Sequence, residues 1–234
     1  MHTTSTGRSA APAVPTRSTV RALLTAAACA VVVVLLGWAV VTGWPPLMHV
    51  DRAVSTALYV GDDRSPPVWL LLQVATGPGS FGVRMVLLLP VLGWLVLHRA
   101  WWTAAWVLTA TALVSPLTDL LKDLVGRPRP QFAGGGARYE SLSFPSGHCS
   151  GIATLVTVAL VLGRPLLTPV ARRAALAVGI ALVVLVGLTR MWLGVHFLSD
   201  VLGGWAFGLG WTLLVVVAFG ALPGGRAALP GRPS

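Results

Sequence analysis

Long apolar stretches alternate with short polar segments along most of the chain. Each long stretch holds roughly 20 residues, enough for a helix to cross the ~30 Å hydrocarbon core of a bilayer. The six stretches cover residues 21–43, 80–98, 101–122, 147–163, 171–189 and 199–220. In the last one, Gly204 and Gly208 match the small-xxx-small pattern of closely packed membrane helices. Because a backbone in lipid must satisfy its own hydrogen bonds, the pattern predicts an all-α, polytopic membrane protein with six transmembrane helices.

A seventh apolar piece, residues 68–75, is too short to cross a bilayer. It lies between a Pro-Pro pair and a Gly-Pro-Gly sequence, so we expect a re-entrant or interfacial segment there. The remaining pattern predicts one six-helix membrane domain over residues 21–220. Residues 1–20, rich in Ser, Thr, Ala and Pro, are predicted to be a disordered cytoplasmic tail, and residues 221–234 a second cytoplasmic tail.

The composition agrees with a membrane protein, since 55% of the residues are hydrophobic and only 10% are charged. The charged residues also indicate an orientation. Nine arginines lie in the N-terminal tail, the 98–100 turn, the 164–173 loop and the C-terminal tail. By the positive-inside rule these segments are cytoplasmic, which places both termini in the cytoplasm. The seven acidic residues fall on the opposite side or at its boundary, in agreement with this orientation.

A net charge of +10 raises the question of nucleic-acid binding. The positive charges are spread over loops that membrane spans separate, so they form no continuous basic face, and we expect no nucleic-acid partner. The chain is poor in lysine and rich in Ala, Val and Arg, a composition typical of GC-rich bacteria. The predicted location is therefore a bacterial cytoplasmic membrane.

The first motif with candidate chemistry is residues 122–130, which read KDLVGRPRP. Lys122 falls at the outer end of the third predicted helix, and Arg129 follows in a segment that prolines stiffen. A guanidinium offers a planar fork to phosphate oxygens, and a lysine adds a point charge. A basic cluster at the membrane interface would show the same pattern, and the role of Arg127 stays open.

The second motif is residues 145–148, which read PSGH and stand directly before an apolar helix. Ser146 is a suitable N-cap, and a helix start offers free N–H groups and a positive dipole end to an anion. Gly147 lets an anion approach the backbone closely. His148 would then lie in the first turn, beside the anion. An ordinary capped helix with an interfacial histidine is the alternative.

The third motif contains Arg190, His196 and Asp200. His196 and Asp200 are four residues apart, so on a helix they share a face. The carboxylate can accept from one ring nitrogen and leave the other as a nucleophile. A carboxylate at the mouth of a membrane helix is costly without such a partner. A purely structural His–Asp pair would not explain Arg190, six residues upstream of His196.

The order and spacing of the three motifs resemble the type 2 phosphatidic acid phosphatase (PAP2) superfamily, which includes the vanadium haloperoxidases. Its pattern is K-x6-RP, then PSGH, then SR-x5-H-x3-D, and only Thr189 departs from it, standing in place of Ser. The resemblance implies a PAP2/haloperoxidase-like helical core that needs no metal and no cofactor. It implies that His196 is the nucleophile, that Asp200 orients it, and that His148 is the general acid. The implied phosphate-binding groups are Lys122, Arg129, Arg190 and the backbone of Ser146 and Gly147.

These features predict an integral-membrane lipid phosphatase that acts on the extracytoplasmic side through a phosphohistidine. The candidate substrates are undecaprenyl or another polyprenyl diphosphate, phosphatidylglycerophosphate and phosphatidic acid, with membrane lipids as the other partners. One alternative is a non-catalytic lipid-phosphate carrier or scaffold with the same fold. Another is a vanadate-dependent haloperoxidase, although those relatives are soluble. Whether the protein forms a homo-oligomer stays open.

Overall fold

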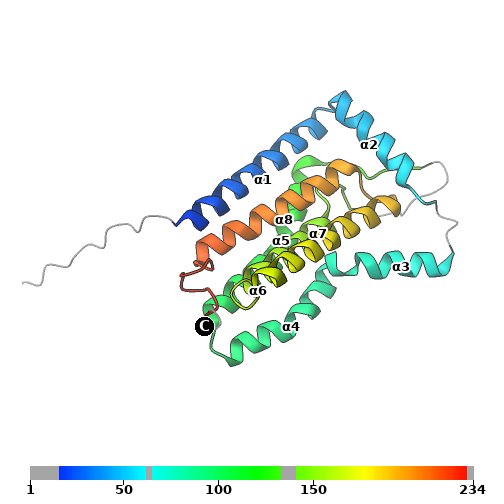
Figure 1. Ribbon diagram of the computed structural model, residues 1–234. Coiled ribbons are helices and arrows are strands. Elements are labelled where there is room, and N and C mark those ends of the chain that lie inside the picture. Colours follow the sequence, from blue (N-terminus) through cyan, green and yellow to red (C-terminus); the bar gives the residue numbers. More distant parts are fainter. Residues whose placement is uncertain (1–15, 62–64, 133–140, 231–234) are drawn as a thin grey trace, which may run out of the picture.

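The computed structural model describes residues 16–61, 65–132 and 141–230. These residues form eight α-helices and one short 3-10 helix, as predicted for an all-α protein (Figure 1). In chain order they are α1 (Arg17–Val41), α2 (Pro45–Leu58), α3 (Pro66–Thr76), η1 (Gly77–Gly79), α4 (Phe81–Leu97), α5 (Trp101–Val125), α6 (Gly147–Gly163), α7 (Pro169–Trp192) and α8 (Leu198–Phe219). Most of the predicted N-terminal tail, residues 1–15, and the last four residues of the predicted C-terminal tail lie outside the described residues.

Capping residues and prolines explain where several helices begin and end. Thr16 and Thr168 each accept a hydrogen bond from the backbone N–H three residues further on, which satisfies the first turns of α1 and α7. Helices α2, α3 and α7 each start with a proline, at a position where the missing N–H removes no helical hydrogen bond. Gly126 and Gly220 follow α5 and α8 in the left-handed conformation, with φ of 68° and 66°.

Helices lie where the six spans were predicted, but the count of six is not confirmed. Among the described helices, α1, α5, α7 and α8 are each long and apolar enough to cross a membrane. A fifth crossing results if the segment from α3 to α4 is one span, broken by a bend of 57°. Helix α6 is apolar but has only 17 residues. The bent segment contains the apolar piece at 68–75, and its shape is that of a broken span or a re-entrant loop.

Helix α8 packs against α1, α5, α6 and α7 (Figure 1). Its glycines allow the approach to α6: a Cβ on Gly204 would collide with the carbonyl of Ser146, and one on Gly208 with the carbonyl of Ser150. The small-residue packing predicted for this helix is thus confirmed. Many large apolar side chains of α1, α4 and α7 point outward and are exposed. Such a surface is expected of a bundle that faces lipid.

All three motifs meet at one end of the bundle, because successive long helices reverse direction (Figure 1). Helices α5 and α7 end there, and α6 and α8 begin there, while α2 lies across that end. At the opposite end, residues 221–230 fold back on the start of α5. Thr103 donates to the carbonyl of Ala227 at 2.9 Å, and the guanidinium of Arg226 lies 4.3 Å from the ring centre of Trp102. The predicted domain boundaries stay predictions.

Candidate active site

His196 and Asp200 form a buried pair at the start of α8. Nδ1 of His196 lies 3.4 Å from Oδ2 of Asp200, and the same oxygen accepts from the backbone N–H of Phe197 at 2.9 Å. The imidazole is 2% exposed, and the carboxylate is fully buried. Because a carboxylate only accepts hydrogen bonds, the contact assigns a proton to Nδ1. The lone pair of the neutral ring is then on Nε2.

Arg129 faces that lone pair. Its Nη1 lies 3.2 Å from Nε2 of His196 and donates to the carbonyl of Val195 at 2.9 Å. Ser141 holds the other side of the guanidinium, through its carbonyl at 2.7 Å from Nε and its hydroxyl at 2.9 Å from Nη2. Since arginine has only donors, the contact fits a ring that carries no proton on Nε2. A cation is thereby fixed beside the nitrogen predicted to be the nucleophile.

The environment keeps His196 neutral. Burial lowers the pKa of His196 to about 4, and the charges of Arg190 and Arg129 act in the same direction. The hydrogen bond and the charge of Asp200 raise that pKa, but the effect of burial is larger. His196 lies in the connection between α7 and α8, outside both helices. Its ring is therefore unprotonated near pH 7, as a nucleophile has to be.

Lys122, in the last turn of α5, reaches toward the start of α6. Its Nζ forms an ion pair with Oδ1 of Asp119 at 2.7 Å. The same Nζ lies 3.7 Å from the position that a Cβ would take on Gly147. The structure thus brings Lys122 and Gly147 together, and the absence of a side chain at Gly147 leaves space beside the ammonium group.

Ser146 occupies the N-cap position of α6, as predicted, but its side chain makes no capping hydrogen bond. Its backbone N–H donates to the carbonyl of Asp200 at 3.0 Å. That N–H is therefore already engaged within the protein, and the predicted contact between the backbone of Ser146 and phosphate stays a prediction. The hydroxyl of Ser146 is buried and has no hydrogen-bond partner within the described part of the chain. Because a buried polar atom without a partner is costly, the hydroxyl is the better candidate for an anion contact.

His148 and Arg190 complete the cluster. His148 is partly buried in the first turn of α6, where the charges of Arg190, Arg129 and Lys122 act on it. Arg190 is 4% exposed, and its Nη1 donates to the hydroxyl of Thr76 at 3.3 Å. Helix α3 therefore helps to hold a guanidinium of the third motif. The two histidines and two arginines share one electrostatic environment.

Thr189, the one departure from the family pattern, does not contribute its hydroxyl to this cluster. The hydroxyl is fully buried and donates to the carbonyl of Val186 at 2.7 Å, within its own helix. It thereby satisfies a helical carbonyl, which a serine hydroxyl could also do.

Positive charge at the site comes from side chains of α5, α7 and the 126–132 segment. These are Lys122, Arg190 and Arg129. Within residues 16–61, 65–132 and 141–230, no group of three or more His, Cys, Asp or Glu side chains could hold a metal ion. The arrangement is that of an anion site lined by cationic side chains.

Two residues of the site were missed in the sequence. Arg127, whose role the motif left open, is 6% exposed and donates to Asp200 at 2.6 Å and to Asp51 at 2.7 Å. Asp51, on α2, is 1% exposed, although the sequence indicated only that it lies on the outer side. One signal was available: the chain has only seven acidic residues, and an acid inside an apolar domain requires a partner.

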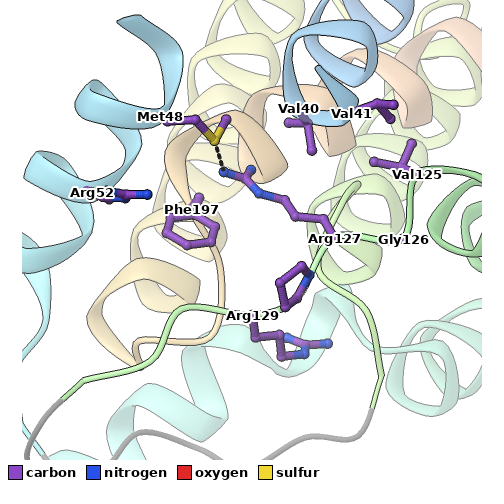
Figure 2. A pocket seen from close by; sticks show the side chains of 10 residues that line it. Val40, Val41, Met48, Arg52, Val125, Gly126, Arg127, Arg129 and Phe197 are labelled. Carbon is purple, nitrogen blue, oxygen red and sulfur yellow. Dashed lines mark hydrogen bonds between the residues drawn. The ribbon is translucent and has the colours of Figure 1, made fainter. Parts of the chain in front are cut away.

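A cavity of about 380 Å³ adjoins the site on the side of α1 and α2 (Figure 2). Its charged lining residues are Arg52, Arg127 and Arg129. Its other lining residues are Val40, Val41, Met48, Val125, Gly126, Pro128 and Phe197. Figure 2 shows Arg52 entering from α2 and Arg127 on the opposite wall, with its guanidinium toward Met48. The cavity thus combines cationic groups with apolar surface, a mixture common in ligand pockets.

Residues 100–222 match the PAP2 superfamily, and the chain belongs to this family. The matched segment contains all three motifs, from Lys122 to Asp200. It does not contain Asp51, α2, α3 or α4.

Curated relatives include several bacterial phosphatases. The chain is 34% identical over 165 residues to phosphatidylglycerophosphatase B of Bacillus subtilis, with 68% of the chain and 78% of that protein covered. It is 33% identical over 129 residues to lipid A 1-phosphatase of Rhizobium etli, with 50% of the chain and 51% of that protein covered. It is 34% identical over 147 residues to decaprenylphosphoryl-5-phosphoribose phosphatase of Mycobacterium tuberculosis, with 59% of the chain and 75% of that protein covered.

The fold also matches a solved structure, that of a transmembrane PAP2-type phosphatidylglycerolphosphate phosphatase from Bacillus subtilis. The TM-score is 0.71 at 27% sequence identity, and the match covers 82% of this chain and 94% of the other. Together with the apolar helices, these relatives establish an integral membrane protein of the PAP2 type. The relatives named above are lipid phosphatases, but they act on different lipids.

Proposed function

We propose that the protein is an integral-membrane lipid phosphatase that hydrolyses a lipid phosphomonoester or diphosphate through a phosphohistidine intermediate. One observation supports this proposal above the others. The imidazole of His196 contacts a pure acceptor, Asp200, at Nδ1 and a pure donor, Arg129, at Nε2. A fixed lone pair therefore lies beside a cation, the arrangement needed for attack on a negatively charged phosphoryl group.

In the first step, Nε2 of His196 attacks phosphorus and the bond from phosphorus to the leaving oxygen breaks. His148, which takes up a proton when the negatively charged phosphoryl group binds beside it, gives that proton to the leaving oxygen. The carboxylate of Asp200 stabilises the positive charge that develops on the imidazole of His196. In the second step, His148 takes a proton from water, the water oxygen attacks phosphorus, and the bond to His196 breaks to release phosphate.

The transition state of each step places negative charge on the equatorial phosphoryl oxygens. Lys122, Arg129 and Arg190 provide the opposing charge, and the hydroxyl of Ser146 and the backbone of Gly147 provide neutral contacts. Because side chains supply the positive charge, we expect turnover without a metal ion. That makes the proposed enzyme a metal-independent phosphatase.

The lipid is proposed as a class. The candidates are phosphatidylglycerophosphate, undecaprenyl or another polyprenyl diphosphate, and phosphatidic acid. The relative named phosphatidylglycerophosphatase B supports the first of these lipids, and the relative named for a decaprenyl-linked phosphate supports a polyprenyl chain. The cavity beside Arg129 offers room and charge for the part of the headgroup next to the reacting phosphate.

For the orientation we propose six crossings, both termini in the cytoplasm, and the motifs at the extracytoplasmic face of a bacterial cytoplasmic membrane. The placement of the arginines supports it. Helix α1 also begins, and the described chain ends, at the end of the bundle away from the motifs (Figure 1). With an even number of crossings, the first and the last helix have their outer ends on the same side of the membrane.

Purified protein in detergent would test the function with a panel of these lipids, by released phosphate, with His196→Ala as the inactive control. We expect release from at least one lipid, unchanged by EDTA. No release from any of them would favour the carrier alternative. Peroxide-dependent bromination with added vanadate would favour the haloperoxidase. Loss of activity in EDTA, restored by magnesium, would contradict metal independence.

A further inference from the structure

Arg127 bridges two buried carboxylates behind the candidate nucleophile. Its Nη1 lies 2.6 Å from Oδ1 of Asp200, and its Nη2 lies 2.7 Å from Oδ2 of Asp51. Ser199 reinforces the bridge: its hydroxyl accepts from Arg127 at 2.7 Å and donates to Asp51 at 2.5 Å, and its N–H donates to Asp51 at 2.9 Å. The guanidinium also stacks 4.1 Å from the ring centre of Phe197. The path from α2 to His196 is therefore a continuous set of hydrogen bonds.

Further contacts bind the end of α2 to the connection between α7 and α8 and to the segment after α5. The N–H of Val60 donates to the carbonyl of Trp192 at 3.2 Å. The rings of Tyr59 and Phe132 stack with 3.9 Å between their centres. Both rings lie against Gly194, where no Cβ could be accommodated and φ is +69°. Helix α2 is thus fixed to the connection that carries the nucleophile.

The charges in this cluster have a direct consequence for His196. If Arg127 were paired with Asp200 alone, its charge would cancel the negative field that an imidazolium needs. The second carboxylate, Asp51, offsets Arg127, so two carboxylates and one guanidinium leave a single net negative charge behind the ring. In a buried environment such charges are weakly screened, so the net value matters to the imidazole.

We propose that Asp51 and Arg127 are positioning residues, which set the geometry and the net charge of Asp200 behind the nucleophile His196. The proposal rests on the proposed phosphohistidine mechanism. Asp51 lies outside the segment that matches the family, so this part of the site comes from the N-terminal third of the chain. A purely structural clamp between α2 and α8 is the competing explanation.

The variants Asp51→Asn, Arg127→Gln and the double Asp51→Asn/Arg127→Gln separate the two explanations. Asp51→Asn leaves the cluster neutral, Arg127→Gln makes it doubly negative, and the double variant restores one negative charge. We expect Asp51→Asn to lower kcat roughly tenfold. The loss of one negative charge makes the imidazole less basic, and a decrease of one pKa unit has the same free energy as a tenfold decrease in rate. KM of Asp51→Asn should change little, because Asp51 does not line the cavity proposed for the headgroup, whereas Arg127 does. Asp123→Asn, an exposed acid at the end of α5, is the charge-matched control.

The decisive measurement is the titration of His196 by NMR in protein labelled with ¹⁵N-histidine, with its signal assigned by loss in His196→Ala. We expect the midpoint to fall in Asp51→Asn, to rise in Arg127→Gln, and to return toward wild type in the double variant. Arg129, Arg190, His148 and Asp200 also face the ring, and all four are unchanged in every variant. If the residues form only a structural clamp, the midpoint of His196 would move in the same direction in both single variants, or would not move in either. Either result overturns the proposal.

The titration needs no turnover, so it separates this inference from the function itself. Wild-type protein that releases no phosphate from any lipid would refute the proposed function, while the order of the midpoints would still decide the charge argument. Arg127→Gln leaves two buried carboxylates without their cation and is the variant most prone to misfold. If it does not fold, Asp51→Asn and the double variant are sufficient, because the midpoint must rise from the first to the second.

Discussion

The backbone N–H of Ser146 donates to the carbonyl of Asp200 at 3.0 Å, which fixes the start of α6 to the start of α8. The candidate acid, His148, stands in one of these helices, and the candidate nucleophile, His196, precedes the other. Their spacing therefore depends on how closely α6 and α8 approach. Gly204 sets that approach, because its missing side chain leaves room for the carbonyl of Ser146.

Gly204→Ala is expected to reduce phosphate release strongly while the protein still folds. A Cβ there would lie 2.6 Å from the carbonyl oxygen of Ser146, so the two helices have to separate. Overpacking of this kind costs about 1–3 kcal/mol. Phosphate release and the thermal unfolding midpoint in detergent provide the measurement. Gly93→Ala in α4 is the matched control, since its Cβ meets nothing within 4 Å; equal losses in both variants would contradict the explanation.

His196→Ala is expected to abolish both turnover and covalent trapping of phosphate. Rapid quenching of the wild type at alkaline pH should leave protein-bound phosphate that is stable to base and labile to acid, as phosphoramidate bonds are. The measurement is ³²P bound to the protein after gel filtration under denaturing conditions. Substantial turnover by His196→Ala would rule out the covalent mechanism.

His148→Ala is expected to slow poor leaving groups more than good ones. A general acid contributes about 10²–10⁴-fold when the leaving oxygen needs a proton, and far less when it does not. The comparison is between a lipid phosphate and p-nitrophenyl phosphate, each assayed with wild type and variant. The same factor of loss on both substrates would remove His148 from the role of acid.

The sequence allowed the elements and most of the site to be predicted, since both depend on local patterns. Apolar length predicted the membrane helices, and the second and third motifs contained the candidate residues His148, His196 and Asp200. The contact between Asp51 and Arg127 spans 76 residues, so it required the position of α2 across the end of the bundle. The role of Ser146 was only partly predictable, because its N–H is taken by the carbonyl of Asp200 from another helix.

Two single cysteines, Gln131→Cys and Leu166→Cys, would test the proposed orientation in a protein whose native cysteines are replaced by alanine. Both positions are exposed, the first in the segment after α5 and the second in the turn between α6 and α7. We expect an impermeant maleimide to label Gln131→Cys in intact spheroplasts and Leu166→Cys only after permeabilisation. The reverse pattern would invert the proposed orientation, and labelling of both in intact spheroplasts would contradict the span count.

The acid limb of kcat/KM is expected near pH 4 rather than near the ordinary histidine value of about 6.5. Burial lowers the pKa of His196 to about 4, and only the unprotonated ring has a lone pair for attack, so activity falls as the pH drops through that value. Because kcat/KM reports ionisations of the free enzyme, the substrate's own ionisation is measured by ³¹P NMR and divided out.

Asp200→Asn provides the matching variant for this profile. The carboxylate raises the pKa of His196 against the effect of burial, so its loss should move the acid limb to still lower pH. At the same time the plateau should fall about 10⁴-fold, as it does when the acid of a Ser-His-Asp triad is changed to an amide and the imidazole is held in the wrong tautomer. A limb that stays at pH 6.5 in both proteins would show that another group controls activity. A limb near pH 4 that moves down in Asp200→Asn would identify His196 as the group that must be neutral.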